Sequence, residues 1–418
     1  MLEKIIIHGG KPLNGKVKIS GSKNAVLPII VASILAEGES VIYDVPDLTD
    51  VHILKDILKE LGAKITFENN VFRIDTRDVN CWEASYENIN KMRASVLVMG
   101  PLLAKFNKAR VAMPGGCAIG TRPIDLHLKG FESLGAKISL EQGFVSAISE
   151  ERLHGGKIYL DFPSVGATEN IMMAATLAEG TTVIENAAEE PEIVDLANFL
   201  NAMGASVKGA GTNVIKIIGT DKLHGAEHTV IPDRIEAGTY LIAGAVIGGN
   251  LVIENVISHH IKPVIAKLRD CGVDIEELDS SLIVRNAGNF KATDIKTMPY
   301  PGFPTDMQSV FSVLMCLAKG TSIITETVFE NRFMHFDELK RMGAVIKIEG
   351  KSAVIEGVPS LSGCQVKATD LRAGAALIIA GLTCEGKTEV LDVYHVFRGY
   401  ENIIDKLQGL GADIRLEV

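Results

Sequence analysis

The residues best suited to chemistry in this sequence lie in a glycine-rich segment with one cysteine and one arginine. The segment reads PGGCAIGTRP over residues 114–123. A thiol near an arginine can have a lowered pKa, so Cys117 can act as an acid or a nucleophile beside Arg122. The glycines let the backbone approach a ligand closely. A free surface cysteine would fit the same pattern, so the segment alone does not establish a reaction.

Basic residues at the starts of apolar segments form a second group of candidates. They are Lys23, Arg93, Arg234 and Arg372, and the polar residues at equivalent places are Ser22, Ser164, Asp233, Asp306 and Asp370. The polar residues are good helix N-caps, whereas a cation at a helix N-terminus opposes the helix dipole. Four such cations indicate an anionic ligand, a phosphate or a carboxylate, although capping explains each single polar residue equally well.

Three histidines and two arginines in polar segments are weaker candidates. His127, His335 and His395 could act as bases or phosphate donors, but hydrogen-bonded structural histidines fit the same positions. Arg332 and Arg398 each follow a predicted strand and precede an amphipathic helix. A surface ion pair and a ligand-binding role are both consistent with that placement.

The elements that carry these residues follow a sixfold internal repeat. A Leu-Gly-Ala-like turn recurs with its glycine at positions 62, 135, 204, 272, 343 and 411, at intervals of 68 to 73 residues. Each repeat is predicted to contain an apolar helix, a β-branched strand, an amphipathic helix and a second strand. The predicted apolar helices span 25–36, 94–106, 171–178, 237–247, 310–318 and 373–382. A helix that is apolar on every side is buried, so these six should form the cores.

Length and composition set the wider limits. The 418 residues are 47% apolar and 22% charged with a formal net charge of −10, which excludes a disordered chain and disfavours a general nucleic-acid binder. Six repeats make two domains of three repeats, with a break near 220–232. No apolar run reaches the roughly 20 residues of a membrane span. No signal peptide is apparent and the six cysteines show no zinc spacing, so we expect a cytoplasmic protein.

Five motifs in order along the chain resemble one family of enzymes. They read SGSKNA over 20–25, PGGCAIGTRPIDLH over 114–127, FPTDMQ over 303–308, ENRFMH over 330–335 and RGYE over 398–401. The sequence is similar to the UDP-N-acetylglucosamine 1-carboxyvinyltransferases, the enolpyruvyl transferases of the first committed step of peptidoglycan synthesis. The resemblance runs from about Ile6 to Ala412, which is nearly the whole chain.

The resemblance implies an α/β fold of two similar domains, the inside-out α/β barrel of enolpyruvyl transferases, with three repeats in each domain. In that family the N-terminal strand joins the C-terminal domain. The expected domains are therefore 22–230 and 1–21 together with 231–418, with the active site in the cleft between them. The implied substrates are phosphoenolpyruvate and UDP-N-acetylglucosamine. The mechanism needs no metal or other cofactor, and no nucleic acid, membrane or obligate protein partner is expected.

Site roles are implied by the motifs, residue by residue. Cys117 matches the acid that protonates the enol methylene and can form a covalent phospholactoyl adduct, and Asp306 matches the base for the sugar 3-hydroxyl. Lys23, Arg122 and Arg398 match the cations that hold phosphoenolpyruvate, as fixed charges near a ketal intermediate would. The other implied substrate-binding residues are Asn24, Arg93, Pro123, Ile124, Asp125, Leu126, Ser164, Val165, Gly166, Val328, Arg332, Asp370 and Arg372.

Two departures and three alternatives accompany the resemblance. Thr49 and Phe162 stand where some family members have lysine, which puts nucleotide affinity or loop closure in doubt. The related transferase for shikimate 3-phosphate is one alternative, but it lacks the Gly-Gly-Cys loop. A non-catalytic UDP-sugar-binding paralogue is another, but binding alone requires neither Cys117 nor Asp306. A nucleic-acid-binding protein is disfavoured by the acidic charge and by the single tryptophan.

Overall fold

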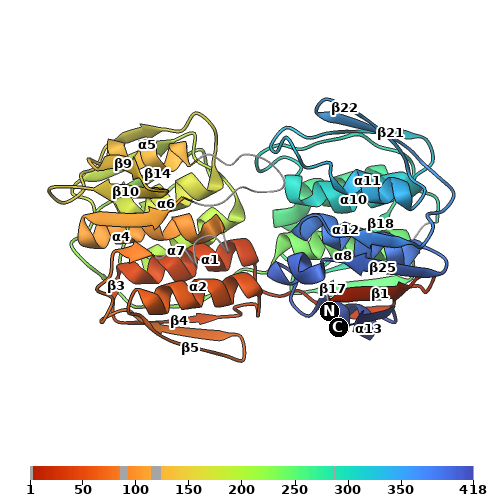
Figure 1. Ribbon diagram of the computed structural model, residues 1–418, viewed down its shortest axis with the longest axis horizontal. Helices are drawn as coiled ribbons and strands as arrows, with labels where there is room; N and C mark the ends of the chain where they lie inside the picture. Colours follow the sequence, from red (N-terminus) through yellow and green to blue (C-terminus); the bar gives the residue numbers. More distant parts are fainter. Residues whose placement is uncertain (1–2, 85–92, 114–123, 286–287, 418) are drawn as a thin grey trace. The chain divides into compact units, whose positions relative to one another are not determined.

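The computed structural model describes residues 3–84, 93–113, 124–285 and 288–417. The chain divides into two compact units, and each has its own hydrophobic core. The N-terminal unit consists of the described residues of 21–231, and the C-terminal unit consists of 3–20 and 232–417. Figure 1 shows the two units with their helices and strands labelled.

The N-terminal unit contains three repeats of helices and short strands. Its helices are α1 (Lys23–Ala32), α2 (Thr49–Glu60), α4 (Met99–Phe106), α5 (Asp125–Ser133), α6 (Val165–Ala175) and α7 (Pro191–Ala202), with 3-10 segments at Ser33–Leu35 and Arg93–Val98. Its strands are β3 (Ala36–Glu37), β4 (Glu39–Tyr43), β5 (Lys64–Glu68), β6 (Val71–Asp75), β7 (Glu83–Ala84), β8 (Lys108–Ala112), β9 (Lys137–Glu141), β10 (Phe144–Ile148), β11 (Lys157–Tyr159), β12 (Thr181–Glu185), β13 (Ser206–Lys208), β14 (Val214–Ile218), β15 (Leu223–His224) and β16 (Glu227–Thr229).

The C-terminal unit repeats the same plan. Its helices are α8 (Arg234–Ile247), α9 (Lys262–Asp270), α10 (Gln308–Leu317), α11 (His335–Arg341), α12 (Leu371–Thr383) and α13 (Ile403–Gly409), with 3-10 segments at Ser258–Ile261, Thr305–Met307 and Val393–Arg398. Its strands are β1 (Lys4–His8), β2 (Gly15–Lys18), β17 (Asn250–Glu254), β18 (Asp274–Glu277), β19 (Ser281–Arg285), β20 (Ile295–Lys296), β21 (Thr321–Thr325), β22 (Val345–Glu349), β23 (Ser352–Glu356), β24 (Gln365–Lys367), β25 (Lys387–Leu391) and β26 (Asp413–Glu417).

Every repeat carries a four-stranded sheet of the same topology. In the order β11-β12-β14-β13, for example, the first pair is parallel and the other two pairs are antiparallel. The strands of the described residues form six separate sheets of this kind and one two-stranded parallel sheet of β15 and β3, and no closed barrel of strands is found among them. The predicted inside-out arrangement is present, because in each unit the apolar helices lie inside and the sheets lie outside.

The first 20 residues of the chain complete two sheets of the C-terminal unit. Strand β1 lies between β25 and β26 and is antiparallel to both, while β2 adds to β17 as a parallel edge strand. The sixth repeat ends at β26 and so lacks the last strand of its hairpin, which β1 supplies. In the N-terminal unit, β16 is the parallel edge strand beside β4, as β2 is beside β17. These pairings place β1 and β2 in the C-terminal unit.

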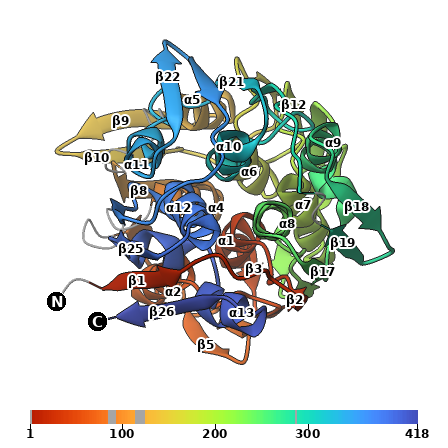
Figure 2. The ribbon, with the colours of Figure 1, turned by 90° about the vertical axis from the view of Figure 1, so that its right-hand side faces the viewer.

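The apolar helices are buried as their composition predicts. In α12 every residue from Arg372 to Leu382 is buried, and Figure 2 shows α8, α10 and α12 near the middle of the C-terminal unit with its sheets around them. Several helices begin earlier than predicted, because polar capping residues start them ahead of the apolar run. The predicted helix 25–36 also ends early, since residues 33–35 form a 3-10 turn. No helix in the described ranges is long and apolar enough to cross a membrane.

Candidate active site

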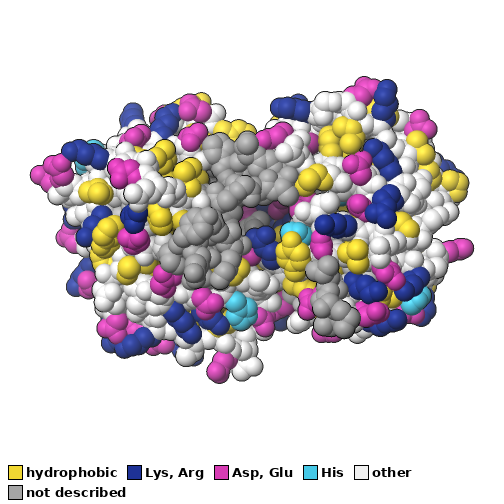
Figure 3. Space-filling view, in the orientation of Figure 1, with side chains coloured by type: hydrophobic (Ala, Val, Ile, Leu, Met, Phe, Trp, Pro, Cys, Tyr) yellow, Lys and Arg dark blue, Asp and Glu magenta, His cyan; other side chains and the backbone are white. Residues whose placement is uncertain are grey.

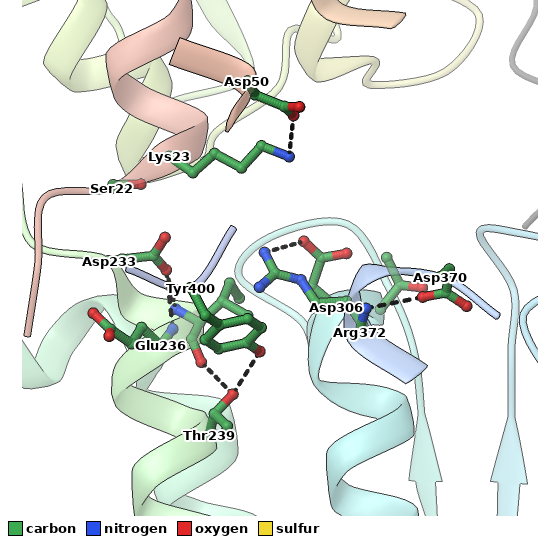
Figure 4. A network of polar contacts seen from close by, with 12 residues as sticks. Ser22, Lys23, Asp50, Asp233, Glu236, Thr239, Asp306, Asp370, Arg372 and Tyr400 are labelled. Atoms are coloured by element: carbon green, nitrogen blue, oxygen red, sulfur yellow. Dashed lines mark hydrogen bonds and ion pairs between the residues drawn. The ribbon is translucent and has the colours of Figure 1, made fainter. Parts of the chain in front are cut away.

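The start of α1 presents a cation that is held by a buried carboxylate. Ser22 caps the helix, and its side-chain oxygen accepts a hydrogen bond from the backbone N–H of Ala25 at 3.3 Å. The ammonium of Lys23 lies 2.7 Å from the carboxylate of Asp50, which belongs to the first turn of α2. The Asp50 side chain is only 2% exposed and that of Lys23 is 12% exposed. Lys23 therefore has a fixed position at the helix start (Figure 4).

A buried amide joins three further elements of the N-terminal unit. Asn170 of α6 donates to the backbone carbonyl of Val96 at 3.0 Å and accepts from the backbone N–H of Gly100 at 2.7 Å. Its amide nitrogen also lies 3.0 Å from a ring nitrogen of His127 on α5. His127 packs against Gly166, where an added Cβ would come within 3.2 Å of the imidazole ring. These contacts fix the starts of α4, α5 and α6, and His127 has the structural role that the sequence allowed.

The predicted nucleotide-binding residues of the N-terminal unit lie at these helix starts. Ser164 caps α6 and accepts from the backbone N–H of Ala167 at 3.4 Å, and Val165 and Gly166 form the first turn. Ile124 is buried just before α5, and Asp125 and Leu126 open that helix. Asn24 is half-buried in the first turn of α1. Thr49 and Phe162, the two positions where the resemblance implied lysine in some family members, are both exposed.

Four predicted site residues cannot be located by their side chains. Cys117, Arg122 and Pro123 lie outside the described residues. Arg93 begins the 3-10 segment that leads into α4. Their roles therefore stay predictions from the sequence.

A carboxylate held by two arginines forms the centre of the site in the C-terminal unit. Asp306, in the 3-10 turn before α10, accepts from Arg332 at 2.7 Å and from Arg372 at 3.2 Å. Figure 4 shows Asp306 beside Arg372. Both guanidinium groups are 3% exposed, whereas the Asp306 side chain is 26% exposed. The hypothesis that Arg332 forms a surface ion pair is therefore wrong, because its side chain is buried. The two arginines keep the Asp306 carboxylate in place while part of it stays accessible.

Arg372 is further restrained by the cap of its own helix and by an aromatic ring. Asp370 caps α12 by accepting from the backbone N–H groups of Arg372 at 2.9 Å and Ala373 at 3.0 Å. The Arg372 guanidinium lies 5.3 Å from the ring centre of Tyr400, whose hydroxyl is 2.8 Å from that of Thr239. Burial opposes the charge of Arg372, but the neighbouring Tyr400 and Asp306 raise its pKa, so the residue stays protonated.

The buried carboxylate of Glu326 binds Thr305, the residue directly before Asp306. Its two oxygens accept from the hydroxyls of Thr297 at 2.8 Å and Thr305 at 2.9 Å. They also accept from the backbone N–H groups of Val328 at 2.8 Å and Phe329 at 3.1 Å. Thr305 in turn accepts from Arg332 at 3.2 Å. Val328, a predicted UDP-sugar residue, is thus held by Glu326 through its backbone.

The start of α8 contains another buried charge network, next to the end of the N-terminal segment. Asp233 caps the helix, and Glu236 in its first turn lies 2.6 Å from Lys406 of α13. The backbone N–H of Ser20 donates to Glu236 at 2.8 Å. Burial raises the pKa of Glu236 to about 6, although Lys406 and Ser20 oppose this. The network fastens residue 20 to the C-terminal unit.

The remaining arginines, histidines and cysteines divide into accessible and structural residues. Arg398 is half-buried at the end of the segment Val393–Arg398, in the position expected for it. His335 is buried with a ring nitrogen 3.0 Å from the hydroxyl of Ser312, and burial lowers its pKa to about 4. Cys316 and Cys384 are in the core as predicted, where burial raises their pKa values to about 12 and about 11. Within the described ranges, no group of three His, Cys, Asp or Glu residues could hold a metal ion.

Two surface features lie apart from these residues. A groove of about 510 Å³ in the C-terminal unit is lined by α9, β20 and β21, and none of its lining residues is a predicted site residue. On the face in Figure 3, acidic and basic side chains are interspersed over each unit. That mixture agrees with the sequence argument against a general nucleic-acid binder.

Three site residues were missed by the sequence analysis. Asp50 was not selected because it reads as an ordinary acidic residue of a helix first turn. Glu326 and Glu236 were not selected because a buried carboxylate cannot be distinguished from an exposed one by residue type alone. The signal that was available for Glu326 is its place between two threonines directly after a β-branched strand, in Thr321–Thr327.

Comparisons with known proteins show the family of this chain. The model of the EPSP synthase (3-phosphoshikimate 1-carboxyvinyltransferase) family matches residues 7–407. The chain is 62% identical over 416 residues to UDP-N-acetylglucosamine 1-carboxyvinyltransferase 1 of Caldanaerobacter subterraneus, with 99% of each chain covered. It is 59% identical to UDP-N-acetylglucosamine 1-carboxyvinyltransferase 2 of Carboxydothermus hydrogenoformans, again with 99% of each covered. A third relative, UDP-N-acetylglucosamine 1-carboxyvinyltransferase 1 of Halalkalibacterium halodurans, is 59% identical, with 99% of this chain and 94% of the relative covered.

Solved structures show the same architecture. The enolpyruvyl transferase NikO from Streptomyces tendae aligns with a TM-score of 0.91 at 25% identity over 99% of each chain. EPSP synthase from Acinetobacter baumannii aligns with a TM-score of 0.78 at 20% identity over the full length of both chains. The fold that the motifs implied is thereby confirmed.

Proposed function

We infer that this chain, which belongs to the EPSP synthase family and within it to the UDP-N-acetylglucosamine 1-carboxyvinyltransferases, is an enolpyruvyl transferase. It transfers the enolpyruvyl group of phosphoenolpyruvate to the 3-hydroxyl of UDP-N-acetylglucosamine and releases phosphate. The observation that carries this function is the 59–62% identity to three proteins of that name over 99% of this chain. The reaction belongs to peptidoglycan synthesis.

The addition step joins the two substrates through one new carbon–oxygen bond. In our proposal Asp306 takes the proton of the sugar 3-hydroxyl, and the oxygen then attacks the second carbon of phosphoenolpyruvate. Cys117 donates a proton to the methylene carbon, which becomes a methyl group. The product is a tetrahedral ketal that carries both the carboxylate and the phosphate. Partial exposure of Asp306 between two fixed arginines supports its role, because a base must reach the substrate in a defined orientation.

The elimination step restores the double bond. The bond from the ketal carbon to the phosphate oxygen breaks, and the phosphate leaves with the proton that Asp306 took in the addition step. The methyl group returns a proton to the Cys117 thiolate. Lys23, Arg122 and Arg398 are proposed to hold the phosphate and carboxylate groups throughout, since fixed cations stabilise charge without reorganisation. The rigid contact of Lys23 with Asp50 supports this assignment.

The substrate-binding residues come from both units. Among the described residues, Lys23, Asn24, Arg93, Ile124, Asp125, Leu126, Ser164, Val165 and Gly166 belong to the N-terminal unit, and Asp306, Val328, Arg332, Asp370, Arg372 and Arg398 belong to the C-terminal unit. In the proposal the two units act as the two domains of one enzyme.

The substrates and the thiols also suggest where the enzyme works. Both proposed substrates are small molecules, and no protein partner is needed for the steps above. Among the described cysteines all five are free thiols, as in a reducing compartment. We therefore propose a cytoplasmic enzyme without an obligate partner.

Release of phosphate from phosphoenolpyruvate tests the proposed function directly. UDP-N-acetylglucosamine and shikimate 3-phosphate are supplied as acceptors in parallel reactions, and a reaction without acceptor is the blank. Release only with the sugar nucleotide would support the proposal. Release with shikimate 3-phosphate would favour the other transferase, and no release with either would favour a non-catalytic UDP-sugar-binding protein.

Substitution of Cys117 tests the proposed acid. Cys117→Ala should abolish or severely reduce phosphate release while UDP-N-acetylglucosamine still binds, as calorimetry can measure. Cys117→Asp should retain part of the activity, because a carboxylic acid can also donate a proton, and it should resist epoxides that alkylate a thiol. Full activity of Cys117→Ala would contradict the role of this residue.

A further inference from the structure

We propose that Glu326 is a positioning residue that sets the orientation of Arg332, and through it that of Asp306, by fixing the hydroxyl of Thr305. The inference rests on the proposed function, because it concerns the base of that reaction. Glu326 itself reaches neither Asp306 nor Arg332 directly by any hydrogen bond among the described residues. Its influence passes through one hydroxyl hydrogen.

The carboxylate of Glu326 is fully occupied by donors. One oxygen accepts from Thr297 and from the backbone N–H groups of Val328 and Phe329, at 2.8, 2.8 and 3.1 Å. The other oxygen accepts from the Thr305 hydroxyl at 2.9 Å. Glu326 is 3% exposed, so solvent does not replace these partners. The first oxygen therefore binds the turn at 328–329, and the second oxygen binds the Thr305 hydroxyl.

The hydrogen bond to Glu326 determines the direction in which the Thr305 hydroxyl hydrogen points. A threonine hydroxyl has one hydrogen to donate and lone pairs to accept. Since the hydrogen is directed at Glu326, the lone pairs are left for the Arg332 guanidinium, which donates to Thr305 at 3.2 Å. The same guanidinium donates to Asp306 at 2.7 Å through its other terminal nitrogen. Arg332 is thus aligned from two sides, by Thr305 and by Asp306.

A glutamine at position 326 would replace the acceptor of the Thr305 hydrogen by a donor with almost no change in shape. Its oxygen can still accept from Thr297, Val328 and Phe329, and its amide nitrogen then faces Thr305 as a donor. The Thr305 hydroxyl would then lose the acceptor that holds its hydrogen away from Arg332, and the hydrogen could rotate. Without a fixed hydroxyl orientation the bond from Arg332 to Thr305 should weaken, so Arg332 should become less well positioned and Asp306 should lose part of its restraint.

The test is steady-state phosphate release by the wild-type protein, Glu326→Gln and a matched control, with thermal unfolding of each. Glu326→Gln should lower kcat by roughly 10- to 100-fold, because small displacements of reacting groups have effects of this size. Its KM for UDP-N-acetylglucosamine should stay within about threefold, since the turn at 328–329 keeps its bonds. The control is Glu338→Gln, a similarly polar change in α11 of the same unit, where Glu338 accepts from the backbone N–H of Lys367 at 3.1 Å. It should match the wild type.

A double variant separates positioning from general structure. Thr305→Val removes the hydroxyl, so Glu326→Gln combined with Thr305→Val should be at least as active as Glu326→Gln alone. Strictly multiplicative losses in the double variant would overturn the relay through Thr305. If Glu326→Gln does not fold, Thr305→Val should reduce kcat more than Thr297→Val, because Thr297 binds Glu326 but does not contact Arg332. Equal effects of those two variants would overturn the proposal.

The failure of this inference differs from the failure of the proposed function. A wild-type protein that releases no phosphate with UDP-N-acetylglucosamine would overturn the proposed function, and this inference with it. An active wild type with a Glu326→Gln variant of unchanged kcat would overturn only the positioning role. A lower melting temperature with unchanged kcat would likewise show that Glu326 is merely structural.

Discussion

The start of α1 in the N-terminal unit and the start of α12 in the C-terminal unit are built alike. Each has a side-chain cap, Ser22 or Asp370, and a cation in the first turn, Lys23 or Arg372. Each cation is paired with a carboxylate from another helix or turn of its own unit. The carboxylates differ, because the side chain of Asp50 is 2% exposed and that of Asp306 is 26% exposed.

This difference shows how one local design can serve two purposes. A carboxylate as buried as Asp50 cannot receive a proton from a substrate, so it can only hold Lys23. Asp306 is fixed by two arginines on one side and accessible on the other, so it can hold Arg372 and also act as a base. The comparison therefore predicts that equivalent substitutions in the two clusters have unequal effects.

The largest effect is expected for Asp306→Asn. The amide keeps the shape of the side chain but cannot accept the 3-hydroxyl proton, so kcat should fall by roughly 10²- to 10⁴-fold. Binding of UDP-N-acetylglucosamine, measured by calorimetry, should persist. The control is Asp337→Asn, an exposed residue of α11 that pairs with Lys340. Loss of less than about tenfold in kcat would mean that another group is the base.

A smaller effect is expected for Asp50→Asn. This variant removes the buried counter-charge of Lys23 but no proton-transfer group, so kcat/KM for phosphoenolpyruvate should fall only about tenfold. Its free energy of unfolding should decrease by about 3 kcal/mol, because a buried charge loses its partner. Urea unfolding and initial rates measure the two quantities. A loss of activity equal to that of Asp306→Asn would remove the distinction between the two clusters.

Substitutions of the two capping residues, Asp370 and Ser22, should have smaller effects on stability than Asp50→Asn. Asp370 accepts from two backbone N–H groups at 2.9 and 3.0 Å, whereas Ser22 accepts from one at 3.3 Å. Asp370→Ala should therefore lower the free energy of unfolding by about 1–2 kcal/mol and Ser22→Ala by about 0.5–1 kcal/mol. Urea unfolding of both variants measures the difference. The reverse order would show that the bonds to Asp370 contribute little to α12.

The smallest effect concerns the pH dependence of the C-terminal cluster. His335, near Arg332, has a pKa lowered to about 4 by burial, so the unfolded chain binds its proton more tightly than the folded protein does. Stability should therefore decrease as the pH falls from about 6.5 toward 4. The variant His335→Gln should lose part of this dependence, as urea unfolding at several pH values would show. An unchanged slope in the variant would contradict the neutral, buried state of His335.

Much of the architecture could be predicted from the sequence because it depends on local patterns. The recurring Leu-Gly-Ala turns and the apolar runs indicated six repeats. Helices α8 and α12 include the runs predicted for them, and α10 ends one residue short of its predicted run 310–318. Cys117, Lys23 and Asp306 could be selected because their motifs are long and occur in order. Helix starts were less predictable. A capping residue such as Asp233 or Asp370 begins its helix before the apolar run by which the helix is recognised in the sequence.

Residue type and spacing along the chain thus determined the repeats, the two-unit plan and the candidates for catalysis. The pairing of Lys23 with Asp50, the two arginines on Asp306 and the relay from Glu326 through Thr305 were decided only by the tertiary structure. So was the insertion of β1 between β25 and β26, which joins residues roughly 380 to 410 positions apart. Burial and hydrogen-bond polarity depend on neighbours from distant repeats, and for that reason no local pattern specifies them.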